Sequence, residues 1–409
     1  MKIKNINARE ILDSRGNPTV ETELELENGI IVKSSVPSGA STGENEALEL
    51  RDNDKDRYHG KGVLTAVNNV NNIIKKSLIG MDINQEKIDD LLINLDGTNT
   101  KSKLGANAIL SVSLCVMKAL AKTNNQDLFE YLGNDFSLPY PMMNIINGGA
   151  HANSGLEIQE FMIIPMQKSF KDRLRCGSEI FQTLKNTLKQ DGYSTSVGDE
   201  GGFAPKLGNI EKALDYIVEA IKKSNYIPGE NVFLALDCAA SEFYDGNNYN
   251  INNKKLTKEE LIEYYILLIN KYPIISIEDA FAENDINSIK ILTSKIGDKI
   301  MLVGDDYFVT NIEYLEKGIK EKYNNAILLK ANQIGTITEM LKTIDLAKKN
   351  NFKTIISHRS GETEDTFIAD LAVGLNLGYI KTGSVCRGER ICKYNQLLRI
   401  EEKLNDKKQ

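Results

Sequence analysis

Residues 325–333 read NAILLKANQ, and the pattern of this stretch is the basis for predicting the fold. Four apolar residues in a row, 326–329, precede Lys330, and a turn-like Ala-Asn-Gln follows. A short apolar run between polar residues is typical of a strand that is buried on both faces. A lone lysine in this position would most simply extend to water with only its stem buried. The neighbouring runs decide whether Lys330 is alone.

Apolar runs of the same kind recur between residue 232 and the C-terminal region, with amphipathic stretches between them. The runs are VFLALD, PIISIED, KIMLVGDD, NAILLK, KTIISHRS and GYIKTG, and their polar end residues are Asp237, Glu278, Asp305, Lys330, His358 and Lys381. Successive end residues are 41, 27, 25, 28 and 23 positions apart, which leaves room for a loop, a helix and a return. This spacing predicts a β/α barrel. An open doubly wound sheet would also fit the runs, but the Gly-rich GxGxxG turn that it favours is missing.

The N-terminal region has a different pattern. Residues 19–36 read TVETELELENGIIVKSSV, in which apolar or Thr positions alternate with glutamates before Asn28-Gly29. This alternation predicts a hairpin with one solvated face, and apolar residues at helical spacing predict a helix over 104–122. A barrel takes about 250 residues of the 409. We therefore expect an α/β protein with a smaller N-terminal α+β domain, residues 1–133, and a C-terminal TIM-like β/α barrel, residues 134–409.

Composition excludes several classes of function. Hydrophobic residues make up 41% and charged residues 26%, as in soluble globular proteins, and no stretch of 18 or more apolar residues indicates a membrane span. The net charge of −7 argues against a nucleic-acid surface. The N-terminus lacks the apolar region of a secretion signal, so we expect a cytoplasmic protein. The five cysteines form no CxxC pair, which indicates reduced thiols without a disulfide framework or a zinc site.

The charged strand ends predict a metal site. In a β/α barrel the active site forms at the C-terminal ends of the strands, where residues distant in sequence become neighbours. Asp237, Glu278 and Asp305 would repel one another there, and a divalent cation is the simplest compensation. Carboxylate oxygens favour magnesium over zinc. Each acid alone would more simply cap the following helix, but three in succession favour a metal site.

Longer motifs carry a resemblance to a known family. They run in order along nearly the whole chain: ILDSRGNPTVE, VPSGASTGENEALELRD, LGANAILSVSL, INGGAHANSGLEIQEFMI, VGDEGGFAP, LALDCAASEFY, SIED, VGDDYFVTN, ANQIGT, SHRSGETEDT, IKTG and YNQLLRIEEKL. With these motifs the chain resembles the enolases, the phosphopyruvate hydratases of glycolysis. It departs from many relatives at Ala280, Ile286 and Gly388, where Pro or Gly, Trp and Ser are usual. These departures concern packing behind the site rather than the proposed reacting groups.

The resemblance implies the reversible dehydration of 2-phosphoglycerate to phosphoenolpyruvate with two Mg²⁺ ions per active site. Asp237, Glu278 and Asp305 would hold the tighter ion, and Ser41 would help to hold the second. Lys330 would remove the C2 proton of the substrate. That base must be uncharged, although free lysine has a pKa of about 10.4. We expect magnesium, Lys381 and burial to lower the pKa of Lys330 towards the working pH.

The same resemblance assigns the other site residues. Glu200, supported by Glu160 and with His151 nearby, would assist the departure of the C3 hydroxyl. The substrate groups would be met by residues of the later motifs: Arg359 and Ser360 at the phosphate, Lys381 at the carboxylate, His358 lining the pocket and Gln159 beside this set. Relatives form homodimers through an ion pair at the positions of Glu21 and Arg399, which as surface charges could equally be solvated. The resemblance also allows an additional cell-surface or secreted pool.

Two other readings of the sequence are possible. One is a non-catalytic binding or scaffold role, but the chain keeps Lys330, Glu200 and all three strand-end carboxylates, which favours catalysis. The other is a different magnesium-dependent barrel enzyme that abstracts a proton next to a carboxylate. The His-Arg-Ser stretch at 358–360 and the Gly/Ser-rich N-terminal loop favour phosphoglycerate as the substrate.

Overall fold

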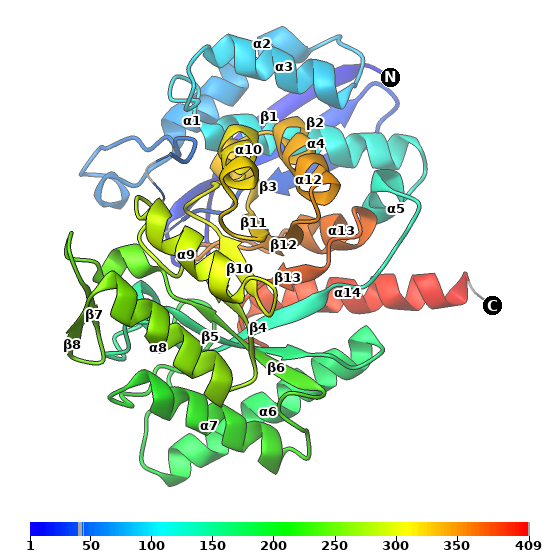
Figure 1. Cartoon of the computed structure of the whole chain (residues 1–409). Coiled ribbons are helices and arrows are strands. Elements are labelled where there is room, and N and C mark those ends of the chain that lie inside the picture. Colours follow the sequence, from blue (N-terminus) through cyan, green and yellow to red (C-terminus); the bar gives the residue numbers. More distant parts are fainter. Residues whose placement is uncertain (40–42, 44, 408–409) are drawn as a thin grey trace.

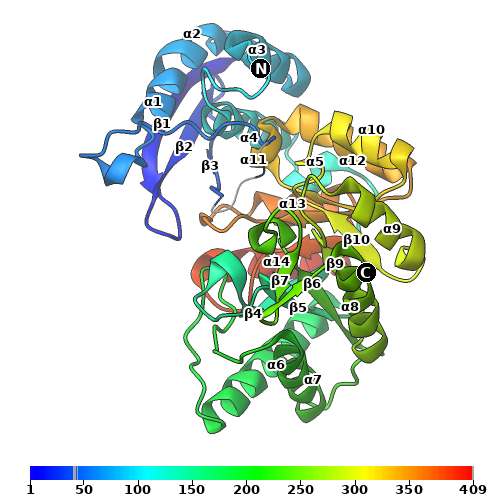
Figure 2. The ribbon, with the colours of Figure 1, turned by 60° about the vertical axis from the view of Figure 1, so that its left-hand side comes forward.

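The computed structural model of the chain describes residues 1–39, 43 and 45–407. An N-terminal domain lies against one side of a closed eight-stranded barrel surrounded by helices (Figures 1 and 2). This architecture confirms the expected fold class, an α+β domain followed by a TIM-like barrel. The exact boundary at residues 133 and 134 remains a prediction.

The N-terminal sheet has three antiparallel strands with β2 in the centre. Its strands are β1 (Ile3–Leu12), β2 (Pro18–Leu26) and β3 (Ile31–Ser35). The predicted hairpin is confirmed, and Gly29, with φ of 85°, makes the turn that a side chain would strain. The outer face of β2 is less solvated than expected. Glu21 is only 7% exposed, because it pairs with Arg9 of β1 at 2.6 Å.

The other elements of the N-terminal domain are helices, and those nearest the sheet pack on its strands. They are α1 (Leu64–Asn68), a π-helical turn (Asn69–Ile74), α2 (Lys75–Leu78), α3 (Gln85–Asp96), α4 (Ala106–Thr123) and α5 (Leu128–Leu132), with a 3₁₀ turn at Tyr58–Gly60. α4 matches the helix predicted over 104–122. It is the one described helix that is long and apolar enough to cross a membrane, but 78% of it is buried inside the protein. It is therefore a core helix that packs on β2 and β3.

The barrel strands close in the order β10-β11-β12-β13-β4-β5-β6-β9. Their bounds are β4 (Tyr140–Asn147), β5 (Glu160–Pro165), β6 (Val232–Asp237), β9 (Ile274–Glu278), β10 (Met301–Gly304), β11 (Ala326–Leu329), β12 (Lys353–Ser357) and β13 (Tyr379–Lys381). Each of the six predicted apolar runs forms one of the last six strands. Asp237, Glu278 and Lys381 are the final residues of their strands, and Asp305, Lys330 and His358 follow theirs directly.

One barrel strand runs against all the others. β5 pairs antiparallel with β4 and with β6, whereas the remaining neighbours are parallel. The reason is local: the connection from β4 to β5 holds only a 3₁₀ turn, Gly149–His151, so the chain makes a hairpin instead of a helical crossover. The start of β5 therefore lies at the rim where the other strands end, and this reversal brings Glu160 to that rim.

The outer layer of the barrel consists of helices that follow the strands. They are α6 (Phe170–Gln190), α7 (Ile210–Lys223), α8 (Lys258–Lys271), α9 (Ile286–Ile296), α10 (Ile312–Glu321), α11 (Ala331–Ile334), α12 (Ile337–Lys349), α13 (Phe367–Gly374) and α14 (Gly388–Asp406). A 3₁₀ turn (Ala240–Phe243) and a small hairpin, β7 (Tyr249–Ile251) and β8 (Lys254–Leu256), lie between β6 and α8.

The two domains share hydrogen bonds at the start of α12. The backbone N–H of Ile337 donates to Ser113 Oγ of α4 at 3.0 Å. The backbone N–H of Thr338 donates to Asp89 Oδ2 of α3 at 2.9 Å, and the Thr338 hydroxyl donates to the same oxygen at 2.6 Å. The first N–H groups of a helix have no partner within it, so residues of the N-terminal domain cap a barrel helix.

Candidate active site

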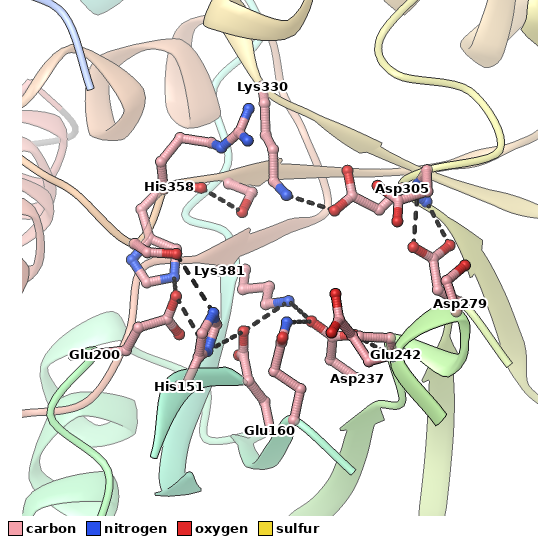
Figure 3. Close-up of a pocket in the computed structure, with 17 residues that line it drawn as sticks. His151, Glu160, Glu200, Asp237, Glu242, Asp279, Asp305, Lys330, His358 and Lys381 are labelled. Atoms are coloured by element: carbon pink, nitrogen blue, oxygen red, sulfur yellow. Dashed lines mark hydrogen bonds and ion pairs between the residues drawn. The ribbon is translucent and has the colours of Figure 1, made fainter. Parts of the chain in front are cut away.

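A polar pocket opens at the C-terminal rim of the barrel strands (Figure 3). It is lined by His151, Gln159, Glu160, Glu200, Asp237, Ala239, Ser241, Glu242, Asp279, Asp305, Asp306, Lys330, Ser357, His358, Arg359, Ser360 and Lys381. Among the described residues, all the predicted site residues line it except Glu278, whose carboxylate accepts from Lys381 Nζ at 2.9 Å. Ser41 lies outside the described residues.

Strand register explains why residues so distant in sequence meet here. Glu160 at the start of β5 is paired with Asp237 at the end of β6, and Asp237 is paired with Glu278 at the end of β9. Three carboxylates therefore stand side by side on one rim. This proximity would be costly in a buried place without compensating charge.

Lysine ammonium groups supply that charge. Lys381 Nζ lies 2.8 Å from Asp237 Oδ2, 2.9 Å from Glu278 Oε1 and 3.2 Å from Glu160 Oε1, and its side chain is 3% exposed. Burial opposes the ammonium, but the three carboxylates outweigh it and raise the pKa of Lys381 well above its usual range. Lys381 is predicted to bind the carboxylate of the substrate, and a side chain that keeps its positive charge suits this role.

Lys330 meets the third strand-end acid. Its Nζ forms a short ion pair with Asp305 Oδ2, and Gln333 Nε2 donates to the other carboxylate oxygen at 2.8 Å. Burial disfavours the ammonium, but the charge of Asp305 outweighs it, so the pKa of Lys330 is raised. The expectation of a lowered pKa is therefore wrong for this arrangement. It overlooked that the acid expected to bind metal can pair with the lysine instead.

We call Asp237, Glu278, Asp305, Lys330 and Lys381 the carboxylate–lysine cluster. Next to it, carboxylate oxygens of Asp279, Asp305 and Asp306 lie within 4.8 Å of one another, close enough to hold a metal ion. Burial and the charge of Asp305 raise the pKa of Asp306 to about 8. Asp279 accepts the backbone N–H groups of residues 305 and 306, each at 3.0 Å, which fixes the turn after β10.

This donor set fits magnesium. The candidate ligands of the carboxylate–lysine cluster and of the adjoining acidic group are carboxylate oxygens, the donors that magnesium prefers. Their pKa values indicate a surplus of negative charge: burial and the neighbouring Asp237 raise the pKa of Glu278 well above its usual range. Asp305 belongs to both the predicted ligand set and the compact acidic group, whereas Asp237 and Glu278 share Lys381.

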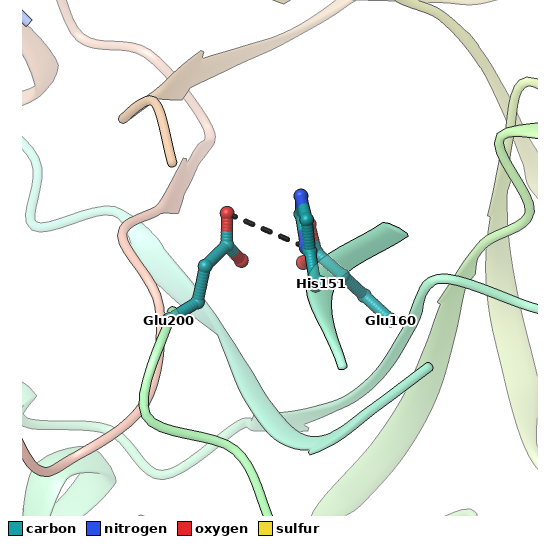
Figure 4. Close-up of side chains that lie close together, drawn as sticks. All are labelled: His151, Glu160 and Glu200. Atoms are coloured by element: carbon teal, nitrogen blue, oxygen red, sulfur yellow. Dashed lines mark ion pairs between the residues drawn. The ribbon is translucent and has the colours of Figure 1, made fainter. Parts of the chain in front are cut away.

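The opposite wall of the pocket carries a second group of side chains (Figures 3 and 4). We call His151, Glu160, Glu200 and His358 the histidine–glutamate cluster. His151 Nδ1 lies 3.7 Å from Glu160 Oε1 and 3.7 Å from Glu200 Oε1, and His358 Nε2 lies 3.3 Å from Glu200 Oε1. Figure 4 shows His151 beside Glu160 and facing Glu200. All four residues are buried.

The two glutamates of this cluster differ in charge. Burial and the nearby charge of Glu200 raise the pKa of Glu160 well above its usual range. Burial acts in the same direction on Glu200, but His358 and His151 outweigh it and lower the pKa of Glu200 well below its usual range. Asn144 Nδ2 also donates to Glu200 Oε2 at 3.1 Å. The environment therefore favours the protonated form of Glu160 and the charged form of Glu200.

The predicted phosphate residues lie between the two clusters. Arg359 is 4% exposed, and its guanidinium donates to both carboxylate oxygens of Glu46, at 2.8 and 3.2 Å. The Ser360 hydroxyl lies 3.3 Å from His151 Nε2. Gln159 Nε2 donates to Asp237 Oδ2 at 3.4 Å, so Gln159 lies beside one of the predicted metal ligands.

Two family models match the chain, and between them they account for nearly all of it. The enolase N-terminal domain matches residues 3–132, and the enolase C-terminal TIM barrel domain matches residues 135–409. The chain belongs to the enolase family. Enolase domains over the full length imply the dehydration of 2-phosphoglycerate to phosphoenolpyruvate, a carbon–oxygen lyase reaction of glycolysis.

The departures from other enolases have little effect on this pocket. Ala280 is 1% exposed, and its carbonyl accepts the Tyr265 hydroxyl at 2.8 Å. Ile286 begins α9 and packs against the barrel core. A Cβ built on Gly388 would meet nothing within 4 Å, so the serine common in enolases would fit there. None of the three residues lines the pocket.

Four residues that contribute to this enolase site were missed in the sequence. Asp279 and Asp306 each follow a predicted ligand directly, so the doublets Glu-Asp and Asp-Asp were the available signal. Glu46 lies in the GENEALELRD stretch of the N-terminal domain, 313 residues from Arg359. Arg390 lies on α14 in RGER, and its contact with His358 has no local signal.

Proposed function

We propose that Lys330 removes the C2 proton of 2-phosphoglycerate and that Glu200 assists the departure of the C3 hydroxyl. The observation that carries this proposal is the placement of the two groups on different walls of one pocket (Figure 3). A substrate between them would present C2 to one group and C3 to the other. Separate groups for the two steps suit a reaction that breaks a C–H and a C–O bond on adjacent carbons.

The carboxylate–lysine cluster would hold the metal. Asp237, Glu278 and Asp305 are the proposed ligands of the tighter of two magnesium ions, and Ser41 remains the predicted ligand of the second. Bound magnesium would neutralise the charge that develops on the substrate carboxylate when the C2 proton leaves. A magnesium ion on Asp305 would place a second positive charge beside Lys330 and would weaken the attraction between Asp305 and the ammonium. The interaction that favours the ammonium of Lys330 is then weaker, which supports its role as a base.

The histidine–glutamate cluster would handle the leaving hydroxyl. The C3 hydroxyl needs a proton as it departs, and the surroundings favour a proton on Glu160 over one on Glu200. His151 lies 3.7 Å from both carboxylates and can relay a proton between them. Burial of all these groups keeps bulk water from competing for that proton. Arg359 and Ser360, at the entrance between the clusters, would bind the phosphate.

The decisive test of this function is the absorbance of newly formed enolpyruvate on mixing the purified protein with 2-phosphoglycerate. We expect turnover that requires added magnesium and stops with a chelator. Phosphoenolpyruvate should be hydrated in the reverse direction. A protein that binds magnesium and 2-phosphoglycerate in calorimetry without producing phosphoenolpyruvate would contradict the proposal and favour a non-catalytic role.

We also propose that the protein is a homodimer in the cytoplasm. Arg399 is exposed on α14 and contacts only Gln396, at 3.4 Å, among the described residues, so it remains available to a partner. Glu21 already pairs with Arg9 of its own chain, so a partner's arginine would join an existing ion pair. Sedimentation at micromolar concentration tests this proposal. We expect a dimer whose dissociation increases in Arg399→Ala, and a wild-type monomer would refute it.

A further inference from the structure

Arg390 of α14 is the largest fully buried side chain of the described structure, and none of the proposed roles uses it. Its guanidinium lies directly behind the histidine–glutamate cluster. Nη1 is 2.7 Å from His358 Nδ1 and donates to the carbonyl of Arg359 at 2.6 Å. Nη2 donates to the carbonyls of Ser360, at 2.6 Å, and Asp199, at 3.1 Å.

The contact with His358 determines which ring nitrogen carries the proton. A guanidinium has five N–H donors and no acceptor. His358 Nδ1 can therefore contact Arg390 at 2.7 Å only through its lone pair. In a neutral imidazole the proton must then be on Nε2, the nitrogen that faces Glu200 Oε1 at 3.3 Å. In the other tautomer, the Nδ1–H would point at an N–H of Arg390, and the lone pair on Nε2 would face the carboxylate of Glu200. Both contacts would be repulsive.

We propose that Arg390 is a positioning residue for the enolase reaction: it fixes His358 as the Nε2–H tautomer, which holds the carboxylate of Glu200. This inference rests on the role proposed for Glu200. It assigns His358 a definite task, donation of a hydrogen bond to a charged acceptor, and it removes His358 from proton transfer through Nδ1.

The charges around His358 support this assignment. The charged groups that act on its ring are Glu200, Arg390 and Glu362. Burial is the largest influence and, with Arg390, outweighs the two carboxylates, so the pKa of His358 is lowered to about 4. The imidazole is thus neutral at pH 7, and the tautomer is a meaningful property there. Arg390 also donates to the backbone carbonyls of Arg359 and Ser360, the proposed phosphate-binding residues. One guanidinium therefore holds both His358 and the phosphate-binding segment in position.

A second buried arginine provides a matched control. Arg173 of α6 is 6% exposed and caps backbone carbonyls only: those of Leu138 at 2.9 Å, Pro139 at 3.1 Å and Gln167 at 2.7 Å. It also donates to the carbonyl of Lys168 at 3.5 Å and lies over the ring of Tyr140, 4.0 Å from its centroid, and none of these residues lines the active-site pocket. Substitution of either arginine by lysine keeps the charge and removes the planar guanidinium group. Only Arg390→Lys should change the tautomer of a histidine.

The test uses the full-length protein with ¹⁵N-labelled imidazoles. The chain has only three histidines, so the His358 signals are assigned by comparison with His358→Gln. In the wild type at pH 7 we expect a protonated Nε2 and a bare Nδ1. Arg390→Lys should populate the Nδ1–H tautomer and lower kcat by about 10-fold to 100-fold. Exchange of the C2 hydrogen with deuterated solvent should continue, because Lys330 is untouched. Arg173→Lys should lower the thermal midpoint without either effect.

The outcomes separate this inference from the proposed function. A wild-type His358 protonated on Nδ1 overturns it without any variant, even if Arg390→Lys fails to fold. A folded Arg390→Lys with an unchanged tautomer and unchanged kcat overturns it as well, because it makes Arg390 a cap of carbonyls like Arg173. Absence of dehydration in the wild type would instead refute the proposed function of the whole site.

Discussion

The two walls of the pocket solve the problem of buried charge in different ways. In the carboxylate–lysine cluster, full charges lie in direct contact, with Lys381 Nζ at 2.8 Å from Asp237 and 2.9 Å from Glu278. In the histidine–glutamate cluster the ionisable groups stand 3.3 to 3.7 Å apart, and the raised pKa of Glu160 favours a proton there that removes one of the charges. One wall is neutralised by ammonium groups and the other by protonation.

This difference indicates which wall must rearrange during the reaction. Lys330 and Lys381 form ion pairs with the carboxylates that are proposed to bind magnesium. Metal binding would therefore change the partners of these carboxylates. The histidine–glutamate cluster is held from behind by Asn144 and Arg390, which the substrate does not displace. The first wall should therefore respond strongly to metal, and the second should keep its geometry. Four substitutions test this contrast.

The largest effect is expected for Lys330→Ala. Without the base, both dehydration and exchange of the C2 hydrogen with deuterated solvent should fall by at least about 10²-fold to 10⁴-fold. Proton NMR of 2-phosphoglycerate in deuterated buffer measures the exchange directly. Lys101→Ala is the control, because Lys101 is also buried and paired, at 3.0 Å from Glu339, but lies outside the pocket. Exchange at a near wild-type rate in Lys330→Ala would sink the assignment of the base.

Glu200→Gln should separate the two steps. The substitution keeps the size of the side chain and removes its charge, so dehydration should fall by about 10²-fold or more. Exchange at C2 should persist, because Lys330 stands on the other wall. The pair of assays distinguishes a group acting on the hydroxyl from one acting on the C2 proton. If exchange stops as completely as in Lys330→Ala, the two walls do not divide the reaction as proposed.

Asp305→Asn should weaken magnesium binding by more than about tenfold, because the ligand charge count sets the affinity of carboxylate sites. Isothermal calorimetry without substrate measures it. Asp306→Asn is the matched control: the same change one residue along, within the same acidic group. We expect a smaller loss of magnesium affinity in Asp306→Asn than in Asp305→Asn. The reverse order would make Asp306 the ligand and correct the predicted set.

The smallest effect is expected for Glu160→Gln on the stability of the ligand-free protein. Burial and Glu200 raise the pKa of Glu160 and so favour its neutral form, and glutamine should therefore lower the free energy of unfolding by less than about 1 kcal/mol. Glu200→Gln removes a charged acceptor of hydrogen bonds and should cost about 1.5 to 3 kcal/mol. Urea unfolding at pH 7 compares the two. Equal costs would show that the proton is not confined to Glu160.

The barrel and its rim were predictable because six of the eight strands are short, largely buried runs that end in, or directly precede, a polar or charged residue. Such runs are visible without any tertiary information, as Lys330 after Ala326–Leu329 shows. The reversed strand was not predicted. Its only signal is the Gly-rich stretch between Asn147 and Glu160, which lacks the helical periodicity of a crossover.

The partners within the site could not be predicted, because they depend on side-chain directions and on packing between domains. Whether Lys330 contacts Asp305 or a substrate is not encoded in either local segment, and the direction of its pKa follows from that contact. Glu46 and Arg390 reach the site from a loop of the N-terminal domain and from the last helix. Their charges resemble ordinary surface charges in the sequence.

The capping of α12 by Asp89 and Ser113 has a consequence for the order in which the chain assembles. Both acceptors leave the ribosome more than 200 residues before the helix that they cap. The N-terminal domain can therefore fold before α12 is synthesised, and Asp89 and Ser113 are then in place to cap the start of that helix. A fragment of residues 134–409 expressed alone would lack both caps, each worth about 0.5 to 2 kcal/mol. The two parts are separable as sequence families but interdependent in biosynthesis.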